Sequence, residues 1–439
     1  MFIHDSYNNH QKKVKPLSAK AAINVFVCGP TVYDSPHLGH ARTYLVMDAL
    51  VKYLRACGEK VFYLQNITDF DDKIINRAAE QKIDWKKVAK KYEKEYLDIC
   101  KILQITSVDK YARATDHLDE IRAQVKRLIV KGLAYETKNG VYFEVKKFKR
   151  YGRLSKQKLD SLKAGYRIDL DPEKKDVLDF ALWKKSDEKP NFPSPWGKGR
   201  PGWHIEDTAI TEKYLGEQYD LHGGGMDLKF PHHEAEIAQE EGGTGKQPLS
   251  RVWMHTGFLT TSGDKMSKSL KNYVTVADFL KKHSAYAMRL MVLAHHYRTP
   301  LNYTEKLATE YDTAWQKIEG YLHTVKMSED LNEKEKKKLS QLLYESNRRF
   351  HRALEKDFNT PIAIAKIYEV IAKAPKVKEC REWVLEHLKF LGFEYAPKKF
   401  GTNLEKLLKK REDLRLEKKF KEADKIRVEI QKAGFTLED

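Results

Sequence analysis

The sequence predicts an α/β protein with a doubly wound parallel sheet, followed by a part that contains only helices. Residues 24–28 form a short apolar run that stops at Gly29-Pro30, as a buried strand does, and a helical pattern over 41–57 follows the next loop. Strand, loop and helix in this order form the first unit of a doubly wound, Rossmann-like sheet. Beyond about residue 278, glycine and proline become rare and a 3.6-residue periodicity dominates, which indicates an all-α part.

Similar patterns predict the remaining elements. A second strand is expected at 61–67 and a last sheet strand at 251–259, with helices at 84–103 and 116–131. The favoured two-residue turn Asn139-Gly140 predicts a hairpin over 134–145. The glycines of 221–227 predict a turn, with Pro231 at the start of the next helix. In the C-terminal part, helices are predicted at 302–327, 333–354, 361–374 and 378–391.

The composition indicates a globular protein with a strong basic excess. The 439 residues carry a formal net charge of +18, with 41% hydrophobic and 33% charged residues. Lysine and arginine neutralise phosphates and release counterions, so a nucleic-acid partner is expected, although a generally lysine-rich proteome gives the same excess. No apolar run approaches the ~18 residues of a membrane span, and residues 1–20 lack the apolar core of a signal peptide, which predicts a cytoplasmic protein. The four cysteines are widely spaced, so no disulfide framework is expected.

Two motifs far apart in the sequence are suited to phosphates. His37 and His40 of a His-Leu-Gly-His sequence fall at the first strand–helix turn, where backbone N–H groups and the helix dipole favour anions. Gly39 between them allows a nucleotide to approach the backbone closely. The segment Lys265-Met-Ser-Lys268-Ser offers two ammonium groups and two hydroxyls in a loop of the kind that closes over phosphates. Each motif alone is compatible with a surface loop, and the pair predicts a nucleotide clamp.

Other polar residues follow strands or share a helix face. Thr68 ends the second strand and is a candidate substrate contact, whereas the acidic residues of 69–72 are compatible with a helix cap. His232 and Glu236 are four residues apart on a predicted helix and therefore share a face. Residues 146–163 hold eight basic residues and one acid, with two aromatic residues interleaved. This segment fits either a solvated loop or a basic surface for the end of a nucleic acid.

The two phosphate motifs together resemble those of class I aminoacyl-tRNA synthetases, and the sequence around them is similar to cysteinyl-tRNA synthetases in particular. The matching stretches are residues 26–34, 66–75, 195–206 and 221–239, followed by His255, Tyr303, 358–361, 423–427 and 437–439. The resemblance therefore covers essentially the whole chain.

The resemblance implies ATP-dependent activation of L-cysteine, with Mg²⁺, and transfer of the cysteinyl group to the 3′ end of tRNA(Cys). The carboxylate of cysteine attacks the α-phosphate and pyrophosphate leaves, while fixed positive groups stabilise charge on the phosphates. The implied residues are His37, His40, Lys265 and Lys268 for catalysis; Pro30, Gly39, His40, Asp227 and Lys268 for ATP; and Gly29, Thr31, Thr68, Trp203 and His222 for cysteine.

The resemblance also implies a division into parts. These are a Rossmann-like catalytic domain (1–120 and 195–260), a connective insertion (121–194), the Lys265–Lys268 loop with a stem-contact region (261–310), a helical bundle (311–395) and a small C-terminal anticodon-binding domain (396–439). The helical half is expected to read the stem and anticodon of the tRNA. The protein is expected to act as a monomer.

Cysteinyl-tRNA synthetases hold a zinc ion that binds the substrate thiolate through two cysteines, a histidine and a glutamate. The corresponding positions here are Cys28, Asp207, His232 and Glu236, so an aspartate replaces the second cysteine. Aspartate is a zinc ligand in other proteins and keeps the ligand charge at −3, but a set with one sulfur binds zinc less selectively. One zinc ion is expected, with His204, His222 and His233 as candidates for orienting its ligands. In the alternative, no metal binds and Asp207 caps its helix.

Three other functions are compatible with parts of this pattern. A synthetase-derived cysteine ligase acting on an amine needs both phosphate motifs, but it does not need residues 401–439 or the basic charge. A nucleotidylyltransferase needs only the His-x-Gly-His motif, which leaves the Lys265–Lys268 loop unexplained. A non-catalytic tRNA-binding paralogue is disfavoured, because His37, His40 and both lysines are intact.

Overall fold

The computed structural model describes all residues except 19–20, 158–171, 262–263, 266–272, 325–330, 397–405, 408–409, 412, 416 and 433–439. The chain divides into two compact units. The first contains Met1–Phe279, Tyr297–Asn302 and Lys356–Phe358, and the second contains Leu280–His296, Tyr303–Glu355 and Asn359–Asp439. Among the helices that the structure describes, none has both the length and the apolar character of a membrane span.

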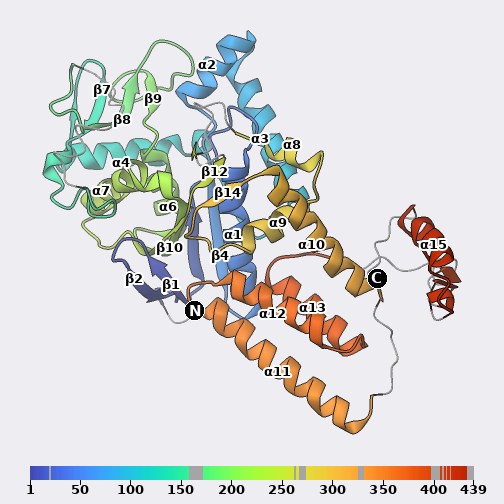
Figure 1. The fold of residues 1–439 in the computed structure, drawn as a ribbon. Helices are drawn as coiled ribbons and strands as arrows, with labels where there is room; N and C mark the ends of the chain where they lie inside the picture. The colour runs from blue at the N-terminus through green and yellow to red at the C-terminus, as the bar shows by residue number, and fades with distance from the viewer. Residues whose placement is uncertain are drawn as a thin grey trace. The chain divides into compact units, whose positions relative to one another are not determined.

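A five-stranded parallel sheet forms the centre of the first unit (Figure 1). Its strands are β3 (Ile23–Val27), β4 (Val61–Ile67), β5 (Lys110–Arg113), β10 (Tyr219–Gly225) and β11 (Ser250–Thr256), in the order β11-β10-β3-β4-β5. The chain winds outward from β3 to β5 and then returns to add β10 and β11 on the other side of β3. The predicted doubly wound sheet is confirmed. Its switch point lies between β3 and β10, where such sheets bind ligands.

Helices cover both faces of this sheet. α1 (Leu38–Ala56) packs on one face, and α4 (Leu118–Val130), α6 (Ile205–Leu215) and α7 (His232–Thr244) pack on the other (Figure 1). Side chains alternate between the two faces of a strand, and Phe26 and Cys28 both belong to the core beneath α4, α6 and α7. The alternation therefore directs the Cys28 sulfur toward α6 and α7.

The prediction of a glycine-rich turn at 221–227 is wrong, because most of this stretch belongs to the buried strand β10, between β3 and β11. A Cβ atom on Gly223 would lie 2.8 Å from the Met47 side chain, and one on Gly224 would lie 2.7 Å from the His233 ring. Glycine inside a strand often marks such a close approach. Only Met226–Lys229 turns, as a short 3-10 helix that leads to α7.

Other predicted elements of the first unit are present with small shifts of their ends. β4 spans the predicted residues, and α3 (Trp85–Ile102) begins after its cap, Asp84. α1 begins at Leu38, before the predicted start, because a histidine cap extends it. α2 (Asp72–Gln81) begins after Asp71, whose carboxylate accepts a backbone hydrogen bond from the first turn. The helix-cap interpretation of the acidic segment is therefore confirmed at Asp71.

The other strands that the structure describes form three smaller sheets. β6 (Ala134–Glu136), β7 (Gly140–Phe143), β8 (Phe180–Lys185) and β9 (Gly199–Pro201) form an antiparallel sheet. The β6–β7 pair is the predicted hairpin, whereas no sequence pattern indicated β8 or β9. A two-stranded sheet contains β1 (Phe2–Asp5) and β2 (His10–Lys13), and a three-stranded sheet contains β12 (Leu259–Thr261), β13 (Asp264–Lys265) and β14 (Leu301–Tyr303).

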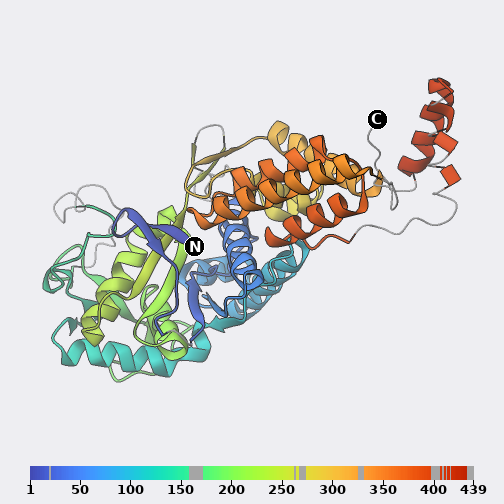
Figure 2. The same ribbon diagram turned by 90° about the horizontal axis from the view of Figure 1, so that it is seen from below.

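Helices dominate the described part of the second unit. After the short α8 (Val276–Leu280), they are α9 (Ala285–Leu293), α10 (Glu305–Thr324), α11 (Glu333–Glu355), α12 (Thr360–Lys373), α13 (Lys378–Phe390) and α15 (Phe420–Lys432). α11 lies beside α12, and α12 also contacts α13 (Figures 1 and 2). The four helices predicted between 302 and 391 are confirmed, and the ends that the structure describes shift by at most three residues. The predicted end of the first helix, at 327, lies outside the described residues.

Candidate active site

A cavity of about 470 Å³ opens at the carboxyl ends of β3 and β10, at the switch point of the sheet. Nine residues singled out in the sequence line it: Cys28, Gly29, Pro30, Thr31, His37, Gly39, His40, Trp203 and Asp227. They come from the loop after β3, the start of α1, the segment before α6 and the turn after β10. The fold thus brings widely separated sequence segments together around one space.

His37 and His40 form the N-terminal cap of α1 at one wall of this cavity. The backbone N–H of His40 donates to His37 Nδ1 at 3.3 Å, and the backbone N–H of His37 donates to His40 Nδ1 at 3.5 Å, as in a capping box. The two rings stack with their centroids 3.7 Å apart. A Cβ atom on Gly39 would lie 2.9 Å from the His37 ring, so the glycine leaves room for that imidazole. The positive end of the helix dipole and two imidazoles therefore meet at the cavity.

The end of β4 supports the loop after β3 from behind. Thr68 is 2% exposed, and its hydroxyl donates a hydrogen bond to the Glu206 carboxylate. The side-chain amide of Asn66 accepts from the backbone N–H of Gly29 at 2.6 Å and donates to Asp207 Oδ1 at 2.5 Å. Thr68 does not line the cavity. The structure therefore places this expected substrate contact among the residues that support the wall.

Four buried side chains with metal-binding atoms meet beside the cavity. They are Cys28, Asp207, His232 and Glu236, each at most 5% exposed. His232 Nε2 lies 2.9 Å from Asp207 Oδ2 and 3.0 Å from Glu236 Oε1, so the predicted shared face of α7 is confirmed. One donor atom from each of the four lies within 4.8 Å of all the others. A thiolate, an imidazole and two carboxylates are ligands that zinc accepts, so these residues fit the metal that the sequence resemblance implies.

Burial and mutual charge shift the pKa values in this cluster. Burial lowers the pKa of His232, but the Glu236 carboxylate and the hydrogen bond to Asp207 outweigh it and raise the pKa to about 10. Burial raises the pKa of Glu236 to about 7, against the opposing effect of His232. Burial and the two neighbouring carboxylates raise the pKa of the Cys28 thiol well above its ordinary value. Metal binding at these residues must therefore release protons.

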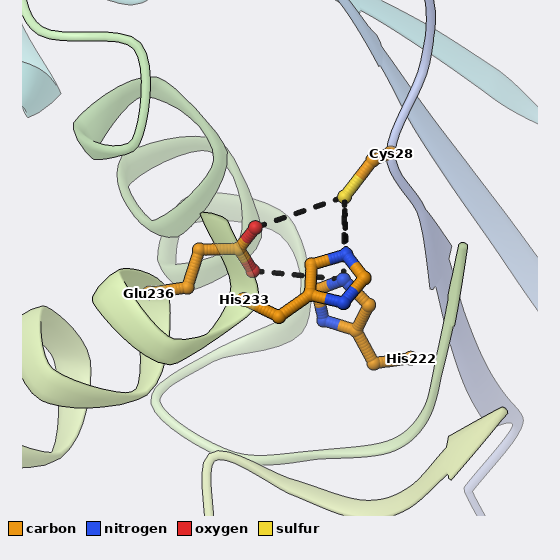
Figure 3. A group of neighbouring side chains, drawn as sticks. All are labelled: Cys28, His222, His233 and Glu236. Carbon is orange, nitrogen blue, oxygen red and sulfur yellow. Dashed lines mark hydrogen bonds and ion pairs between the residues drawn. The ribbon is translucent and has the colours of Figure 1, made fainter. Parts of the chain in front are cut away.

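Further histidines surround the cluster. The Nε2 atoms of His222 and His233 lie 3.3 and 3.2 Å from the Cys28 sulfur (Figure 3). His222 is fully buried and does not line the cavity, so the structure places this expected cysteine contact behind Cys28. His204 Nδ1 lies 2.7 Å from His232 Nδ1, at the position expected of a residue that orients the His232 ring.

The predicted site residues did not include four others that line the cavity wall: Tyr33, Thr43, Lys73 and Thr256. The hydroxyl oxygens of Thr43 and Thr256 lie 2.7 Å apart. The Lys73 ammonium lies 5.3 Å from the centroid of the Tyr33 ring. Of these four, Thr43 alone could have been predicted from the sequence. It follows His40 by three residues on the same helix and therefore shares its face.

Comparisons with known proteins identify the family. Residues 13–312 match the family model described as the tRNA synthetases class I (C) catalytic domain. A cysteine–tRNA ligase of Thermoplasma volcanium is 44% identical over 99% of this chain and 97% of the relative. A cysteine–tRNA ligase of Thermococcus gammatolerans is 42% identical over 100% of this chain and 97% of the relative. The chain belongs to the cysteine–tRNA ligase family of class I synthetases.

A solved structure of another class I synthetase has a similar fold to this member of the cysteine–tRNA ligase family. The methionyl-tRNA synthetase of Mycobacterium tuberculosis bound by methionyl-adenylate superimposes with a TM-score of 0.61, covering 85% of this chain and 88% of that chain. The sequence identity is 14%, so the similarity concerns the fold alone. It agrees with the doubly wound sheet and the helices that follow it.

The second phosphate motif of this cysteine–tRNA ligase family member begins after β12. The backbone of Lys265 pairs with Thr260 in a short antiparallel ladder. The Lys265 side chain and residues 266–272, which include Lys268, lie outside the described residues. The catalytic roles expected for the two lysines stay predictions.

Proposed function

We propose that this chain is a cysteine–tRNA ligase that activates L-cysteine with ATP as cysteinyl-adenylate and then transfers the cysteinyl group from the adenylate to a 3′-terminal hydroxyl of tRNA(Cys), with release of AMP. One observation carries the proposal. The cavity at the switch point combines a phosphate-binding wall, with His37 and His40 at a helix N-terminus, and a buried set of metal-binding side chains that begins with Cys28. The family relationship over the whole chain supports the same activity.

In the first step, the phosphates of ATP bind against the start of α1. A carboxylate oxygen of cysteine attacks the α-phosphorus, the bond to the bridging oxygen of pyrophosphate breaks, and cysteinyl-adenylate and Mg²⁺-pyrophosphate form. His37 and His40, together with Lys265 and Lys268, stabilise the charge that develops on the phosphate oxygens. Pro30, Gly39 and Asp227 line the cavity and are proposed to contact the nucleotide.

The amino acid binds between the nucleotide and the buried cluster. Gly29, Thr31 and Trp203 line the cavity, and the Trp203 ring stacks on His232 with centroids 4.3 Å apart. Cys28, Asp207, His232 and Glu236 are proposed to hold a zinc ion, which supplies a Lewis acid for the substrate thiolate when it is bound. Shape alone separates side chains as small as cysteine and serine by only ~1–3 kcal/mol, so a thiol-specific ligand explains the selectivity.

The acceptor end of the tRNA is proposed to use a neighbouring cavity of about 710 Å³. Four cationic side chains line it, Lys174, Lys184, Lys185 and Arg200, and so do the aromatic side chains Tyr142, Tyr151, Phe180, Trp203 and Phe230. Cationic groups follow a nucleic-acid backbone and aromatic rings stack on unpaired bases. Trp203 lines both cavities, so an acceptor end bound here approaches the adenylate.

Cysteine-dependent ATP–pyrophosphate exchange, followed by charging of tRNA(Cys), tests the proposal. Both activities are expected, with serine far less active than cysteine in exchange. Exchange without charging would favour an amine-directed cysteine ligase. The absence of both activities would favour a non-catalytic tRNA-binding protein.

A further inference from the structure

An arginine two residues beyond His40 is buried beside the cavity. Arg42 lies on α1, is 1% exposed and does not line the cavity. Burial lowers the pKa of Arg42 to about 10, so the side chain still carries its charge at neutral pH. Taking a guanidinium out of water is costly unless acceptors inside the protein replace the water. A charge in this place therefore depends on the groups that surround it.

The guanidinium binds backbone carbonyl groups of two segments that are distant from α1 in the sequence. Arg42 Nη1 donates to the carbonyl oxygens of Gly257 at 2.9 Å and Phe258 at 2.6 Å. Nη2 donates to the carbonyl oxygen of Thr299 and lies 3.5 Å from that of Tyr297. The donors of a guanidinium have a fixed planar arrangement. One side chain therefore fixes both segments relative to each other and to α1.

The first of these segments is part of the cavity wall. Gly257 and Phe258 line the cavity, and His37 and His40 line it from the start of α1. Arg42 belongs to the same helix as the two histidines. Its hydrogen bonds therefore connect the phosphate-facing part of the wall to the part that follows β11.

The same segment leads directly into the hairpin of the second phosphate motif. β12 begins at Leu259, one residue after Phe258, and its partner β13 ends at Lys265. The Phe258 carbonyl also accepts from the backbone N–H of Leu301 at 2.9 Å. The base of the hairpin is therefore held at the residue that Arg42 contacts.

Glycine at position 257 allows the two segments to approach closely. A Cβ atom there would lie 2.6 Å from the Thr299 carbonyl oxygen and 2.7 Å from that of Arg298. The backbone N–H of Gly257 donates to the Tyr297 carbonyl at 2.8 Å. Because the nearest atoms belong to the backbone, a side chain at 257 would push the segments apart. The spacing that lets one guanidinium reach both segments therefore depends on this glycine.

We propose that Arg42 is a positioning residue for the activation step: it holds residues 256–259, and the hairpin that begins there, at a fixed distance from His37 and His40. Charge stabilisation on the phosphates requires groups that are in place before the reaction, and a displacement of about 1 Å can lower the rate about 100-fold. Arg42 acts through the wall and not by contact with the substrates. The inference rests on the proposed function only in taking ATP as the ligand of this wall.

ATP–pyrophosphate exchange by the full chain with Arg42→Lys tests this role. Lysine keeps the charge, but its single nitrogen cannot replace a fork that binds two segments. We expect kcat to fall about 100-fold and the KM for ATP to rise about tenfold. The KM for cysteine is expected to stay within about threefold of wild type, because the residues proposed to bind cysteine come from other segments.

Arg289→Lys is the matched control for the loss of a buried arginine. Arg289 on α9 is also 1% exposed, and its Nη1 donates to the backbone carbonyl of Leu391 at 3.3 Å, within the second unit. This variant is expected to keep the wild-type kcat and KM for ATP, even where it lowers the stability. A purely structural role of Arg42 would give Arg42→Lys the same behaviour.

Gly257→Ala tests the same arrangement without changing Arg42, and it decides the question if Arg42→Lys does not fold. The dissociation constant of ATP, measured by equilibrium dialysis without cysteine or tRNA, is expected to rise about tenfold. This measurement does not require exchange activity. A wild-type protein that binds ATP but shows no cysteine-dependent exchange would therefore contradict the proposed function, while the comparison with Gly257→Ala would still test the spacing.

Three results would overturn the proposal. The first is a kcat and a KM for ATP within about threefold of wild type in folded Arg42→Lys. The second is a parallel rise of the KM values for ATP and cysteine, which would assign Arg42 to general stabilisation of the fold. The third is wild-type affinity of Gly257→Ala for ATP.

Discussion

Asp207 Oδ2 lies 2.9 Å from His232 Nε2, and Asn66 holds the other oxygen of the carboxylate at 2.5 Å. The aspartate is therefore fixed from two sides and faces the buried cluster. It does not act as the N-cap of α6, because it lies inside that helix and His204 occupies the cap position. The interpretation of Asp207 as a helix cap is wrong, and its position is that of a charge partner or a ligand.

Asp207→Cys is expected to slow the loss of zinc to a chelator by about tenfold or more, because a second thiolate makes the ligand set softer and more selective for zinc. The half-time of zinc transfer to a chromogenic chelator measures this effect. Asp119→Cys, which adds a thiol at an exposed position on α4, is the matched control and is expected to leave the half-time unchanged. Equal or faster release from Asp207→Cys would show that residue 207 does not bind the ion.

His40→Asn is expected to lower kcat for ATP–pyrophosphate exchange about 100-fold or more while the KM for cysteine changes little. The imidazole lies at the phosphate wall of the cavity, and loss of one such donor typically costs about 3–4 kcal/mol of transition-state stabilisation. His10→Asn, at an exposed histidine of β2, provides the control and is expected to have wild-type kinetics. A kcat within a factor of three of wild type would remove His40 from the catalytic residues.

Lys268→Met is expected to reduce the rate of adenylate formation by a similar factor, about 100-fold, because it removes a fixed positive charge from the phosphates. Single-turnover measurement of adenylate formation isolates this step from product release. The control is Lys306→Met, at an exposed lysine of α10. If both variants form the adenylate at the same rate, the loop does not act on the phosphates.

The sheet and most helices were predictable because periodicity reports which face of an element is buried. β4 matches its predicted span, and the helices of the second unit follow an unbroken 3.6-residue pattern. β10 was missed because its glycines make room for the Met47 and His233 side chains. Both side chains come from elements that are distant from β10 in the sequence. The local sequence pattern therefore predicted a turn where packing between distant elements requires glycines in a strand.

The same distinction between local pattern and distant packing separates the site residues that were predicted from those that were missed. His37 and His40 were found because their spacing is local and serves a helix cap. The approach of His222 and His233 to Cys28 depends on the register between β3 and β10 and on the position of α7, which no short-range pattern contains. Lys73 was missed for the same reason, since it reaches the cavity wall from α2.

Gly29→Ala is expected to destabilise the protein by about 3 kcal/mol and to reduce exchange activity strongly. A Cβ atom at this position would overlap the backbone carbonyl of Asn66, which cannot move aside without shifting the end of β4. Chemical denaturation measures the free energy of unfolding. Gly243→Ala in α7 is the matched control: the nearest atom there is Arg127 Nε at 3.3 Å, which has to move by only a few tenths of an ångström, so little or no loss of stability is expected. Wild-type stability of Gly29→Ala would mean that the loop after β3 adapts freely.

Glu240→Gln is expected to stabilise the protein increasingly as the pH rises. Burial and the nearby Glu212 carboxylate raise the pKa of Glu240 to about 9, against the attraction of Arg127. One Glu240 oxygen accepts from Gln124 at 2.6 Å, and within the described residues the other has no hydrogen-bond partner. The pKa of Glu240 is higher in the folded protein than in the unfolded chain. The contribution of the protonated carboxyl to the stability of the fold is therefore fully present below about pH 4.5, and it is lost as the pH rises through about 9.

Glutamine stays neutral over this range, so the difference in unfolding free energy between Glu240→Gln and wild type is expected to be below about 1 kcal/mol at pH 5. It is expected to grow by about 1.4 kcal/mol per pH unit, to roughly 5 kcal/mol at pH 8.5. Urea unfolding at both pH values measures that difference. Glu59→Gln, at an exposed glutamate, controls for the loss of one negative charge and is expected to show no such trend. A difference that does not change with pH would mean that Glu240 is ionised in the folded protein, held so by Arg127 despite its burial.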